Sequence, residues 1–409
     1  MSKVLGIIAE YNPFHNGHLH HLNESKKITG ATYTVAIMGG NFTQRGNTSI
    51  MDKWSKAKSA LECGVDLVIE LPVLYAISSA ENFADGAIKI LNSMNIVDYI
   101  SFGAETSDIS ILDNIANILY EEPENYKNFL SNELQTGLSF PKARENALLK
   151  YLNNNKFANV LSSPNNILGI EYLKALKKYK SEIQPIVIPR FEANHNDIDY
   201  QENIASGTAI RTLLKNKEFD TIKNLIPSPV FSNLIENIDI GHVVPDLSVF
   251  EREVILNLRR MSTYEISLLP DVSEGLEFSI KKAANSCNSI AELLNMINSK
   301  RYTSTRLQRI LLYSLLGITK KDMNISKVTN PYIRVLGFNE HGKNLVSKIS
   351  KSNPKLNIIT SVKNFTDKNL DKNLKIMLEK DIWATDVYTI GYEHNSCGNL
   401  DFTHKLITI

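Results

Sequence analysis

Short apolar runs alternate with amphipathic stretches along the first part of the chain. The apolar runs, rich in β-branched side chains, are residues 4–9, 32–38, 65–71 and 98–104. Each run is typical of a buried strand, and the stretches between them have the periodicity of helices. Strands that are apolar throughout and alternate with helices predict a parallel sheet covered on both faces. Ligands of such a sheet bind in the crevice at the carboxyl ends of its strands.

A helical stretch interrupts this alternation at about residues 108–160, and we interpret it as an insertion. The sheet is expected to resume after it. The predicted elements are a helix at 165–180, a fifth strand at 183–189 and a last helix at 206–218. Pro227 and Pro229 then mark the end of a domain that spans residues 1–225.

Two further regions are predicted after this domain. Residues 226–330 have a helical pattern, most clearly at 305–318, and residues 331–409 mix strands with helix. The strands predicted in the last region are 332–338, 355–362 and 387–392, around a helix at 340–350. The fold class is therefore α/β: a Rossmann-like parallel sheet with a helical insertion, followed by a helical region and a small α/β C-terminal region.

Composition places the chain among ordinary globular proteins. Its 409 residues are 43% hydrophobic and 22% charged, enough for two or three domains with cores of their own. The net charge of +1 excludes a strong global field, so a nucleic-acid surface would have to be a local patch. The three cysteines form neither a CxxC pair nor a disulfide framework, and no signal peptide or long apolar segment is visible. We therefore expect a reduced, cytoplasmic protein with no membrane span.

Four of the nine histidines follow the first strand directly: His15, His18, His20 and His21. Three interpretations are open. A zinc site would need a further ligand, and no Cys, Asp or Glu follows at a familiar spacing. Surface or capping histidines would need no further explanation. A phosphate site is the third interpretation, because Gly17 lets the backbone approach a ligand and the first N–H groups of the helix point toward it. The imidazoles would then donate hydrogen bonds where charge develops in phosphoryl displacement.

This turn resembles a known motif. The sequence NPFHNGH is similar to the HxGH motif of the HIGH-type nucleotidyltransferase (HUP) superfamily, and ASGTAIR at residues 205–211 resembles its ISSTxxR motif. The resemblance implies that both motifs bind the phosphates of ATP and stabilise the transition state. The catalytic residues that it implies are His15, His18, Ser206, Thr208 and Arg211. The superfamily has a second hydroxyl residue where this chain has Gly207.

Seven stretches narrow the family: IAEYNPFHNGH, GGNFTQRG, GVDLVIELP, SFGAE, NNILGIEYL, PRFEANHND and KRYTSTRLQR. Together they resemble the bacterial tRNA(Met) cytidine acetate ligase family over most of the chain. That family activates acetate with ATP to acetyl-adenylate, then acetylates the wobble cytidine of elongator tRNA(Met) to N4-acetylcytidine. The resemblance implies a ligase with ATP, acetate and elongator tRNA(Met) as substrates and partners. We expect Mg²⁺ to be held mainly by the phosphates and water, since no dedicated carboxylate cage is evident.

The same resemblance implies an ATP site. It comprises Ile7, Ile8, Ala9, Glu10, Tyr11, Asn12, Pro13, Phe14, Asn16, Gly17, Leu19 and His20, together with Gly103, Asn165 and Arg190. Plainer interpretations of the last three are open: a strand-ending glycine, a helix cap, and a surface arginine. Asn166 is an alternative to Asn165. The loop at residues 39–49, which carries Arg45, would close over the acyl group, meet the RNA, or be an ordinary flexible loop.

Basic residues gather near the end of the helical region. Residues 300–321 contain six of them and no acidic residue. On a helix, one stripe would carry Tyr302, Arg306, Arg309 and Tyr313. Arginines interleaved with tyrosines suit phosphate contact and base stacking, although a solvated helix face is the plainer alternative. The predicted RNA-binding residues are Arg259, Arg260, Lys300, Arg301, Tyr302, Arg306 and Arg309.

Two other functions stay open. One is a nucleotidyltransferase or acetate-activating ligase that acts on a small molecule or a carrier protein. The other is a non-catalytic RNA-binding protein with a nucleotide-binding fold. The length beyond residue 225 and the basic helix favour the RNA-modifying ligase over the first, and His15, His18 and Arg211 disfavour the second. The residues alone fix neither the acyl donor, nor the particular tRNA, nor the oligomeric state.

Overall fold

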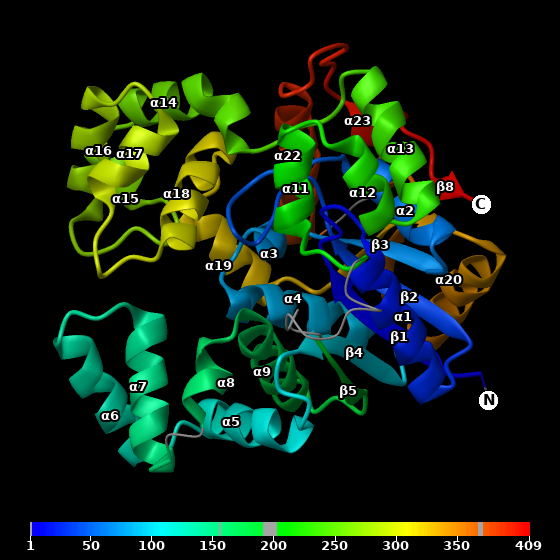
Figure 1. Cartoon of the computed structure of the whole chain (residues 1–409), viewed down its shortest axis with the longest axis horizontal. Coiled ribbons are helices and arrows are strands. Elements are labelled where there is room, and N and C mark those ends of the chain that lie inside the picture. The colour runs from blue at the N-terminus through cyan, green and yellow to red at the C-terminus, as the bar shows by residue number, and fades with distance from the viewer. Residues whose placement is uncertain (1, 155–156, 191–202, 367–370) are drawn as a thin grey trace.

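One eight-stranded sheet organises the chain (Figure 1). The structure, a computed structural model, describes residues 2–154, 157–190, 203–366 and 371–409. The first five strands are β1 (Val4–Ala9), β2 (Tyr33–Gly39), β3 (Leu67–Leu71), β4 (Tyr99–Ala104) and β5 (Gln184–Pro189). They pair in parallel in the order β5-β4-β1-β2-β3. The five strands predicted from the apolar runs are therefore confirmed.

Successive side chains of these strands enter two different cores. In β2, Val35 and Ile37 lie in one core and Ala36 and Met38 in the other, and all four are fully buried. The helices over the first face include α3 (Val73–Ala76), α4 (Ala80–Ser93) and α9 (Pro164–Lys178). Those over the second include α1 (Asn16–Thr29), α2 (Lys53–Glu62), α11 (Gly207–Lys215), α12 (Phe219–Leu225) and α13 (Ser228–Asp239). Burial on both faces explains why the strands are apolar throughout.

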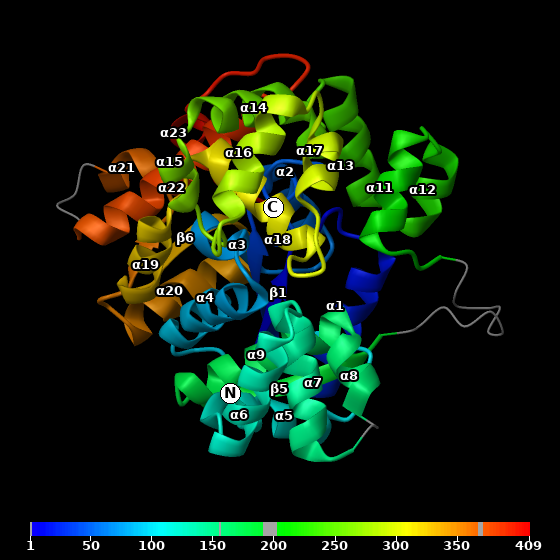
Figure 2. The same ribbon diagram turned by 90° about the vertical axis from the view of Figure 1, so that its left-hand side faces the viewer.

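Two groups of helices project from this body and lie apart from each other (Figures 1 and 2). The predicted insertion is helical and contains α5 (Ile109–Glu121), α6 (Glu124–Gln135), α7 (Phe140–Leu152) and α8 (Ala158–Ser162). The predicted helical region contains the 3₁₀ helix η2 (Leu247–Phe250), α14 (Glu251–Arg260), α15 (Thr263–Ser267), α16 (Leu276–Ser286), α17 (Ile290–Ile297), α18 (Ser304–Leu316) and α19 (Lys320–Val328). None of the helices in the described ranges combines the length and hydrophobicity needed to cross a bilayer.

The last part of the chain extends the same sheet. β6 (Tyr332–Phe338) pairs antiparallel with β3, and β7 (Asn357–Ile359) and β8 (Ile407–Thr408) both pair with β6. The helices of this part are α20 (Glu340–Ser352), α21 (Val362–Thr366), α22 (Lys372–Thr389) and α23 (Leu400–Thr403). Division of the chain at residues 225 and 330 stays a prediction, but the sheet is continuous across it.

The strand predicted at 387–392 is wrong. Residues 387–389 form the last turn of α22, and Tyr388 is fully buried against the first core. A short apolar run does not distinguish a strand from a buried helix, and here the run continues a long helix whose buried positions recur every three or four residues, at Leu374, Leu378, Asp381 and Thr385. Tertiary burial therefore outweighs the β propensity of the run.

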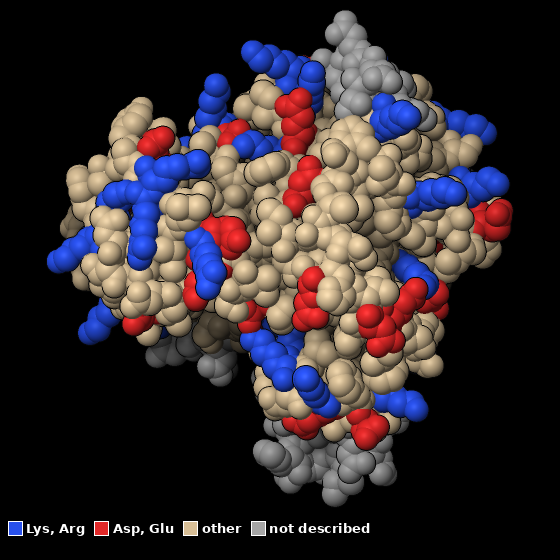
Figure 3. All heavy atoms as spheres, turned by 90° about the horizontal axis from the view of Figure 1, so that it is seen from above, with Lys and Arg blue, Asp and Glu red and all other residues tan. Residues whose placement is uncertain are grey.

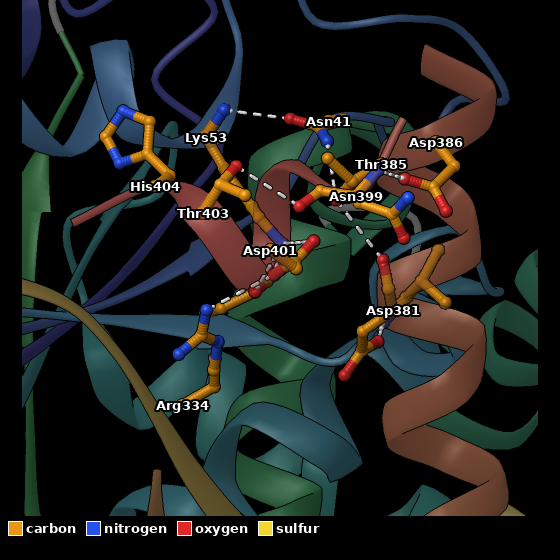
Figure 4. Close-up of polar contacts among 12 residues, drawn as sticks. Asn41, Lys53, Arg334, Asp381, Thr385, Asp386, Asn399, Asp401, Thr403 and His404 are labelled. Atoms are coloured by element: carbon orange, nitrogen blue, oxygen red, sulfur yellow. Dashed lines mark hydrogen bonds and ion pairs between the residues drawn. The ribbon is translucent and has the colours of Figure 1, made fainter. Parts of the chain in front are cut away.

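A cluster of buried charges fastens this C-terminal part to the body (Figure 4). The Lys53 ammonium, at the start of α2, lies 3.0 Å from the Glu70 carboxylate of β3 and 2.8 Å from that of Asp401. The Arg334 guanidinium of β6 pairs with the same Asp401 at 3.2 Å. Two cations and two anions compensate each other here, as buried charges require. Next to them the Asn41 amide donates to the hydroxyl of Thr385 in α22, 3.2 Å away.

Candidate active site

The strand-to-helix turn after β1 places two histidines against each other. His15 is the N-cap of α1, and its backbone N–H donates to Nδ1 of His18, 3.2 Å away. The two rings stack with centroids 3.7 Å apart. Because Nδ1 of His18 accepts a hydrogen bond, its proton resides on Nε2, which is left as a donor. Nδ1 of His15 is buried and has no hydrogen-bond partner within the residues that the structure describes.

Both imidazoles are neutral in the free protein. Burial lowers the pKa of His15 to about 4, helped by the Arg190 and Arg211 guanidiniums. Burial also lowers the pKa of His18 well below its ordinary value, and His15 adds to this effect. The neutral imidazoles donate hydrogen bonds without adding positive charge next to the guanidiniums. A phosphate bound there would favour the protonated imidazoles. The turn is thus suited to an anion whose charge increases during a reaction.

Other residues of the turn hold it in place. Ile7, Tyr11 and Phe14 are at most 2% exposed and pack in the second core beneath it. The Asn16 amide donates to the carbonyls of Asn203 and Asn224, each 2.9 Å away, which ties the start of α1 to the segment around α11. Some of the predicted ATP-site residues between 7 and 20 therefore support the turn from the core, while others, such as Gly17 and His20, are partly exposed.

The second motif meets the turn at the backbone of Asn12. The Arg211 guanidinium donates to the Asn12 carbonyl at 2.8 Å and to the Thr208 hydroxyl at 3.0 Å. Ser206 is the N-cap of α11, and its hydroxyl accepts from a backbone N–H 3.2 Å away. A Cβ at Gly207 would lie only 3.1 Å from the Asn12 carbonyl oxygen. The glycine therefore replaces the superfamily's second hydroxyl residue at a point where backbone approaches backbone.

The predicted residues of the adenosine side also come together. The Arg190 guanidinium donates to the Asn165 side-chain carbonyl at 2.7 Å, and the Asn165 amide donates to the Glu105 carboxylate at 2.6 Å. A Cβ at Gly103 would lie 3.2 Å from the Arg190 side chain. Asn165 is not a helix cap, since α9 begins at Pro164 after Ser163. The rest of the stretch that follows Arg190, residues 191–202, lies outside the described residues.

Asn166 has a different role from its neighbour. It is 1% exposed, and its side-chain carbonyl accepts from the backbone N–H of Thr106, 3.0 Å away. Its own backbone N–H donates to Glu105 at 3.0 Å. Asn166 therefore fixes the end of β4, while Asn165 lies on the side of Arg190. Glu105, which joins the two asparagines, was missed from the sequence, where it is one acidic residue among many.

A buried lysine beneath the crevice was also missed. The Lys56 ammonium of α2 donates to the backbone carbonyls of Glu10, Gly39 and Gly40 at 3.0, 2.8 and 2.6 Å. Burial lowers its pKa to about 8. The Glu10 carboxylate in turn accepts the backbone N–H of Gln44 at 2.6 Å, and burial raises the pKa of this carboxyl. One ammonium thus joins the carboxyl ends of β1 and β2, and nothing in the helical pattern of α2 distinguishes it from a surface lysine.

The four clustered histidines do not converge as metal ligands would. Nε2 of His21 lies 2.8 Å from the Ser101 hydroxyl of β4, away from the stacked pair. His20 is partly exposed. Within the described ranges, no group of three or more His, Cys, Asp or Glu side chains is placed to hold a metal ion. The zinc interpretation therefore finds no ligand set in this part of the chain.

The basic stripe on α18 is not an exposed face, which corrects the prediction. Arg309 is 7% exposed and pairs with the Asp271 carboxylate at 2.9 Å. Tyr313 is 1% exposed and donates to the Ile77 carbonyl at 2.8 Å. Arg306 is partly buried and donates to the Asp271 carbonyl at 2.9 Å. These side chains therefore contact other parts of the protein instead of forming an exposed face. The prediction failed because the spacing i, i+4, i+7 occurs in buried stripes of a helix as well as in exposed ones.

Other predicted RNA contacts do face solvent. Arg259 and Arg260 are exposed at the end of α14, although the Arg259 guanidinium also donates to the Ala284 and Cys287 carbonyls at the end of α16. Lys300 is exposed, and Arg301 is about half exposed beside Glu274. Figure 3, seen from above the view of Figure 1, shows Lys and Arg side chains on the left, the side on which the helical region lies, and also elsewhere on this face. An RNA surface there stays a prediction.

Comparison with known proteins identifies the family. Residues 2–401 match the family model described as HIGH Nucleotidyl Transferase. The tRNA(Met) cytidine acetate ligase of Thermoanaerobacter sp. (strain X514) is 46% identical over 406 residues, which cover 99% of this chain and 100% of that protein. The chain belongs to the tRNA(Met) cytidine acetate ligase family. The enzyme of the same name from Caldanaerobacter subterraneus subsp. tengcongensis is also 46% identical, over the full length of both chains.

Two solved structures of this family share the fold. Crystal structures of Thermotoga maritima TmcAL, one apo and one bound with alpha-thio ATP, match with TM-scores of 0.94 and 0.93. They are 35% and 34% identical to this chain, and each match covers all of this chain and 99% of the other. The family's α/β nucleotidyltransferase fold therefore extends over the whole chain, including β6 and the helical region.

Proposed function

We propose that this protein is an ATP-dependent ligase that activates acetate as acetyl-adenylate and transfers the acetyl group to N4 of the wobble cytidine of elongator tRNA(Met). The product is N4-acetylcytidine. The observation that carries the proposal is the meeting of two phosphate-binding motifs at one turn, where the stacked His15 and His18 lie beside the Arg211–Asn12 contact. Full-length relatives named for this activity support the choice of substrates.

The geometry suits adenylation because that step needs placed donors rather than a nucleophilic side chain. An acetate oxygen attacks the α-phosphorus of ATP, the bond to the bridging oxygen breaks, and pyrophosphate leaves with the electron pair. His15 and His18 donate to phosphate oxygens whose charge increases in this step. Arg211, Ser206 and Thr208 receive the departing pyrophosphate at the start of α11. In the second step the cytidine N4 amine attacks the acetyl carbonyl, loses a proton, and AMP leaves.

We expect magnesium to enter this site together with ATP, bound to its phosphates. Glu10, which directly follows β1, is partly buried and already accepts the Gln44 N–H, so it does not offer a ready metal ligand. We expect Mg²⁺ to be held by the phosphates and water, as is usual for this ion. When bound, Mg²⁺ would neutralise charge on the phosphates. The positions of the reacting groups are set by the side chains of the two motifs.

Labelled acetate, ATP and tRNA incubated with the protein test the proposal directly. Mass spectrometry of the digested tRNA should find labelled N4-acetylcytidine only when ATP is present. Changing His18 to Ala should reduce acetate-dependent ATP–pyrophosphate exchange about 10²-fold or more, because transition-state hydrogen bonds are lost. His341→Ala is the matched control, since this histidine is exposed on α20 far along the chain from both motifs. Undiminished exchange in the His18 variant would contradict the assignment.

Two outcomes would favour the other candidate functions. Acetyl-adenylate formation without transfer to any tRNA would favour a ligase acting on a small molecule or carrier protein. Tight tRNA binding with no adenylate formation would favour a non-catalytic RNA-binding protein. A non-catalytic RNA-binding protein would not need the stacked pair of His15 and His18.

A further inference from the structure

The loop after β2 is a small hairpin rather than a flexible segment. Phe42 and Thr48 form an antiparallel bridge, and the backbone N–H of Thr43 donates to the Asn47 carbonyl at 2.8 Å. The N–H of Gly46 donates back to the Thr43 carbonyl at 3.0 Å, which closes a tight turn over residues 43–46. Arg45 lies at the tip of this turn.

Contacts on both sides of Arg45 fix its position. On one side, the Gln44 backbone N–H donates to the Glu10 carboxylate at 2.6 Å, and the Gln44 side chain donates to the Ser78 carbonyl at 3.0 Å. On the other side, Gly46 lies directly on α18: a Cβ there would be 2.5 Å from the backbone nitrogen of Arg309. Gly46 also has a φ of +78°, which only glycine adopts without strain.

The side chain between these two anchors has no partner. Arg45 is exposed and makes no hydrogen bond or ion pair with any residue in the described ranges. Its charge nonetheless acts on the site. It opposes the rise that burial causes in the pKa of Glu10, and after burial it contributes to the lowered pKa of Arg211. The Glu10 carboxylate acts on both guanidiniums, but the hydrogen bond that it accepts comes from the Gln44 N–H, so the exposed Arg45 guanidinium remains available to a bound anion.

The sheet order indicates which anion this is. The adenosine side of the site lies at the ends of β4 and β5, and the phosphate motifs lie at the start of α1 and α11. β2 lies on the other side of β1 from β4, so its hairpin borders the flank that nucleotide-binding residues leave open. The remaining reactant of adenylation is the acid, and its carboxylate has to approach a negatively charged phosphate. A positioned cation at this flank offsets that repulsion.

We infer that Arg45 binds the carboxylate of the acid substrate and orients it toward the α-phosphorus of ATP. The hairpin at residues 42–48 is the acid subsite, with Glu10 fixing its backbone from beneath and α18 from above. This inference rests on the proposed function and adds the location of its acetate site. It also assigns the loop to the acyl side of the reaction rather than to RNA.

The experiment measures three affinities on the full-length protein. Acetate KM comes from acetate-dependent ATP–pyrophosphate exchange, ATP affinity from titration calorimetry without acetate, and tRNA affinity from filter binding. Arg45→Ala should raise the acetate KM about 10- to 100-fold, as expected for one lost charge-assisted contact, and leave ATP and tRNA affinity within about twofold. Arg45→Lys keeps the charge and should recover part of the loss. Arg252→Ala, at an exposed arginine of α14, is the control and should change none of the three.

A second variant moves Arg45 without removing it. Gly46→Ala introduces a methyl group where α18 leaves no room, so it should raise the acetate KM while the arginine is still present. Circular dichroism and ATP titration show whether the variant is folded.

The outcomes separate the two proposals. A wild-type protein without acetate-dependent exchange overturns the proposed function and this inference with it. An active wild type with an unchanged acetate KM in Arg45→Ala overturns the inference alone. Loss of ATP affinity would make Arg45 a phosphate ligand, and loss of tRNA affinity alone would make it an RNA contact; either result also overturns the acid subsite.

Discussion

Replacing Lys56 by Met should destabilise the carboxyl ends of β1 and β2. Methionine has a similar length but donates no hydrogen bond, so the three buried carbonyls that Lys56 contacts at 2.6 to 3.0 Å lose a charged donor. An unsatisfied buried acceptor costs about 1–3 kcal/mol, and removing the desolvated ammonium returns part of that cost. We therefore expect a net loss of about 2–4 kcal/mol in the free energy of unfolding near neutral pH.

The dependence of this loss on pH is a sharper test. Burial lowers the pKa of Lys56 from 10.5 to about 8, so between these values the unfolded chain binds more protons than the native one. The stability contributed by this group therefore rises with pH across the window, by about 3 kcal/mol in total. The Met variant lacks this titration. The difference in unfolding free energy between wild type and variant should widen from about pH 7.5 to about pH 9.5.

Denaturant unfolding followed by circular dichroism at both pH values measures the difference. Lys58→Met is the matched control, because Lys58 lies on the same helix, is exposed, and pairs with Glu236 at the surface. Its effect should stay within about 0.5 kcal/mol. Two results would contradict this account of Lys56 as a desolvated, hydrogen-bonded ammonium. One is a Met variant as stable as wild type, and the other is a difference in unfolding free energy that narrows as pH rises.

Three further predictions concern charge elsewhere in the chain. Arg260→Glu should weaken tRNA binding and flatten its salt dependence by roughly one unit, with folding intact, as measured by filter binding across salt concentrations. Arg309→Ala should instead lower thermal stability, since it leaves the Asp271 carboxylate without its partner, and unchanged melting would show that the pair is not structural. Asp401→Asn should cost about 3–5 kcal/mol because Lys53 loses an anion. Burial raises and Lys53 lowers the pKa of Asp401, with a net decrease, so this cost should shrink as pH falls below about 4 in unfolding titrations.

The sequence predicts those parts of the fold in which local pattern and environment agree. The five parallel strands are apolar because both their faces are buried, and the pattern records that burial directly. The turn at His15 and His18 is found because a glycine, two histidines and a strand-to-helix boundary occur within a few residues. Gly103, Asn165 and Arg190 depend on resemblance, since their proximity arises from three separate elements.

Other parts depend on partners that are distant in sequence. Arg309 has the spacing of a surface residue, and only the position of Asp271 shows that it is buried. Lys56 is similar, because its three acceptors are backbone carbonyls of two strands and carry no signal in the sequence. The pairing of β6 with β3 joins segments more than 250 residues apart, which no local periodicity encodes.

The long-range closure of the sheet has a consequence for how the chain folds as it is synthesised. Lys53 emerges from the ribosome long before Arg334 and Asp401, which complete its charge cluster, and Asp401 follows Lys53 by 348 residues. Until then β3 is an unprotected edge strand, and α2 carries an ammonium with only Glu70 to compensate it. Domains tend to fold as they emerge, N-terminal part first. Here the edge strand β3 is covered only by β6 from the C-terminal part, so complete folding of the N-terminal part is delayed. A nascent chain therefore completes this charge cluster and covers the edge of β3 only after Arg334 and Asp401 have been made, so chains that stop before these residues are expected to be left unfolded.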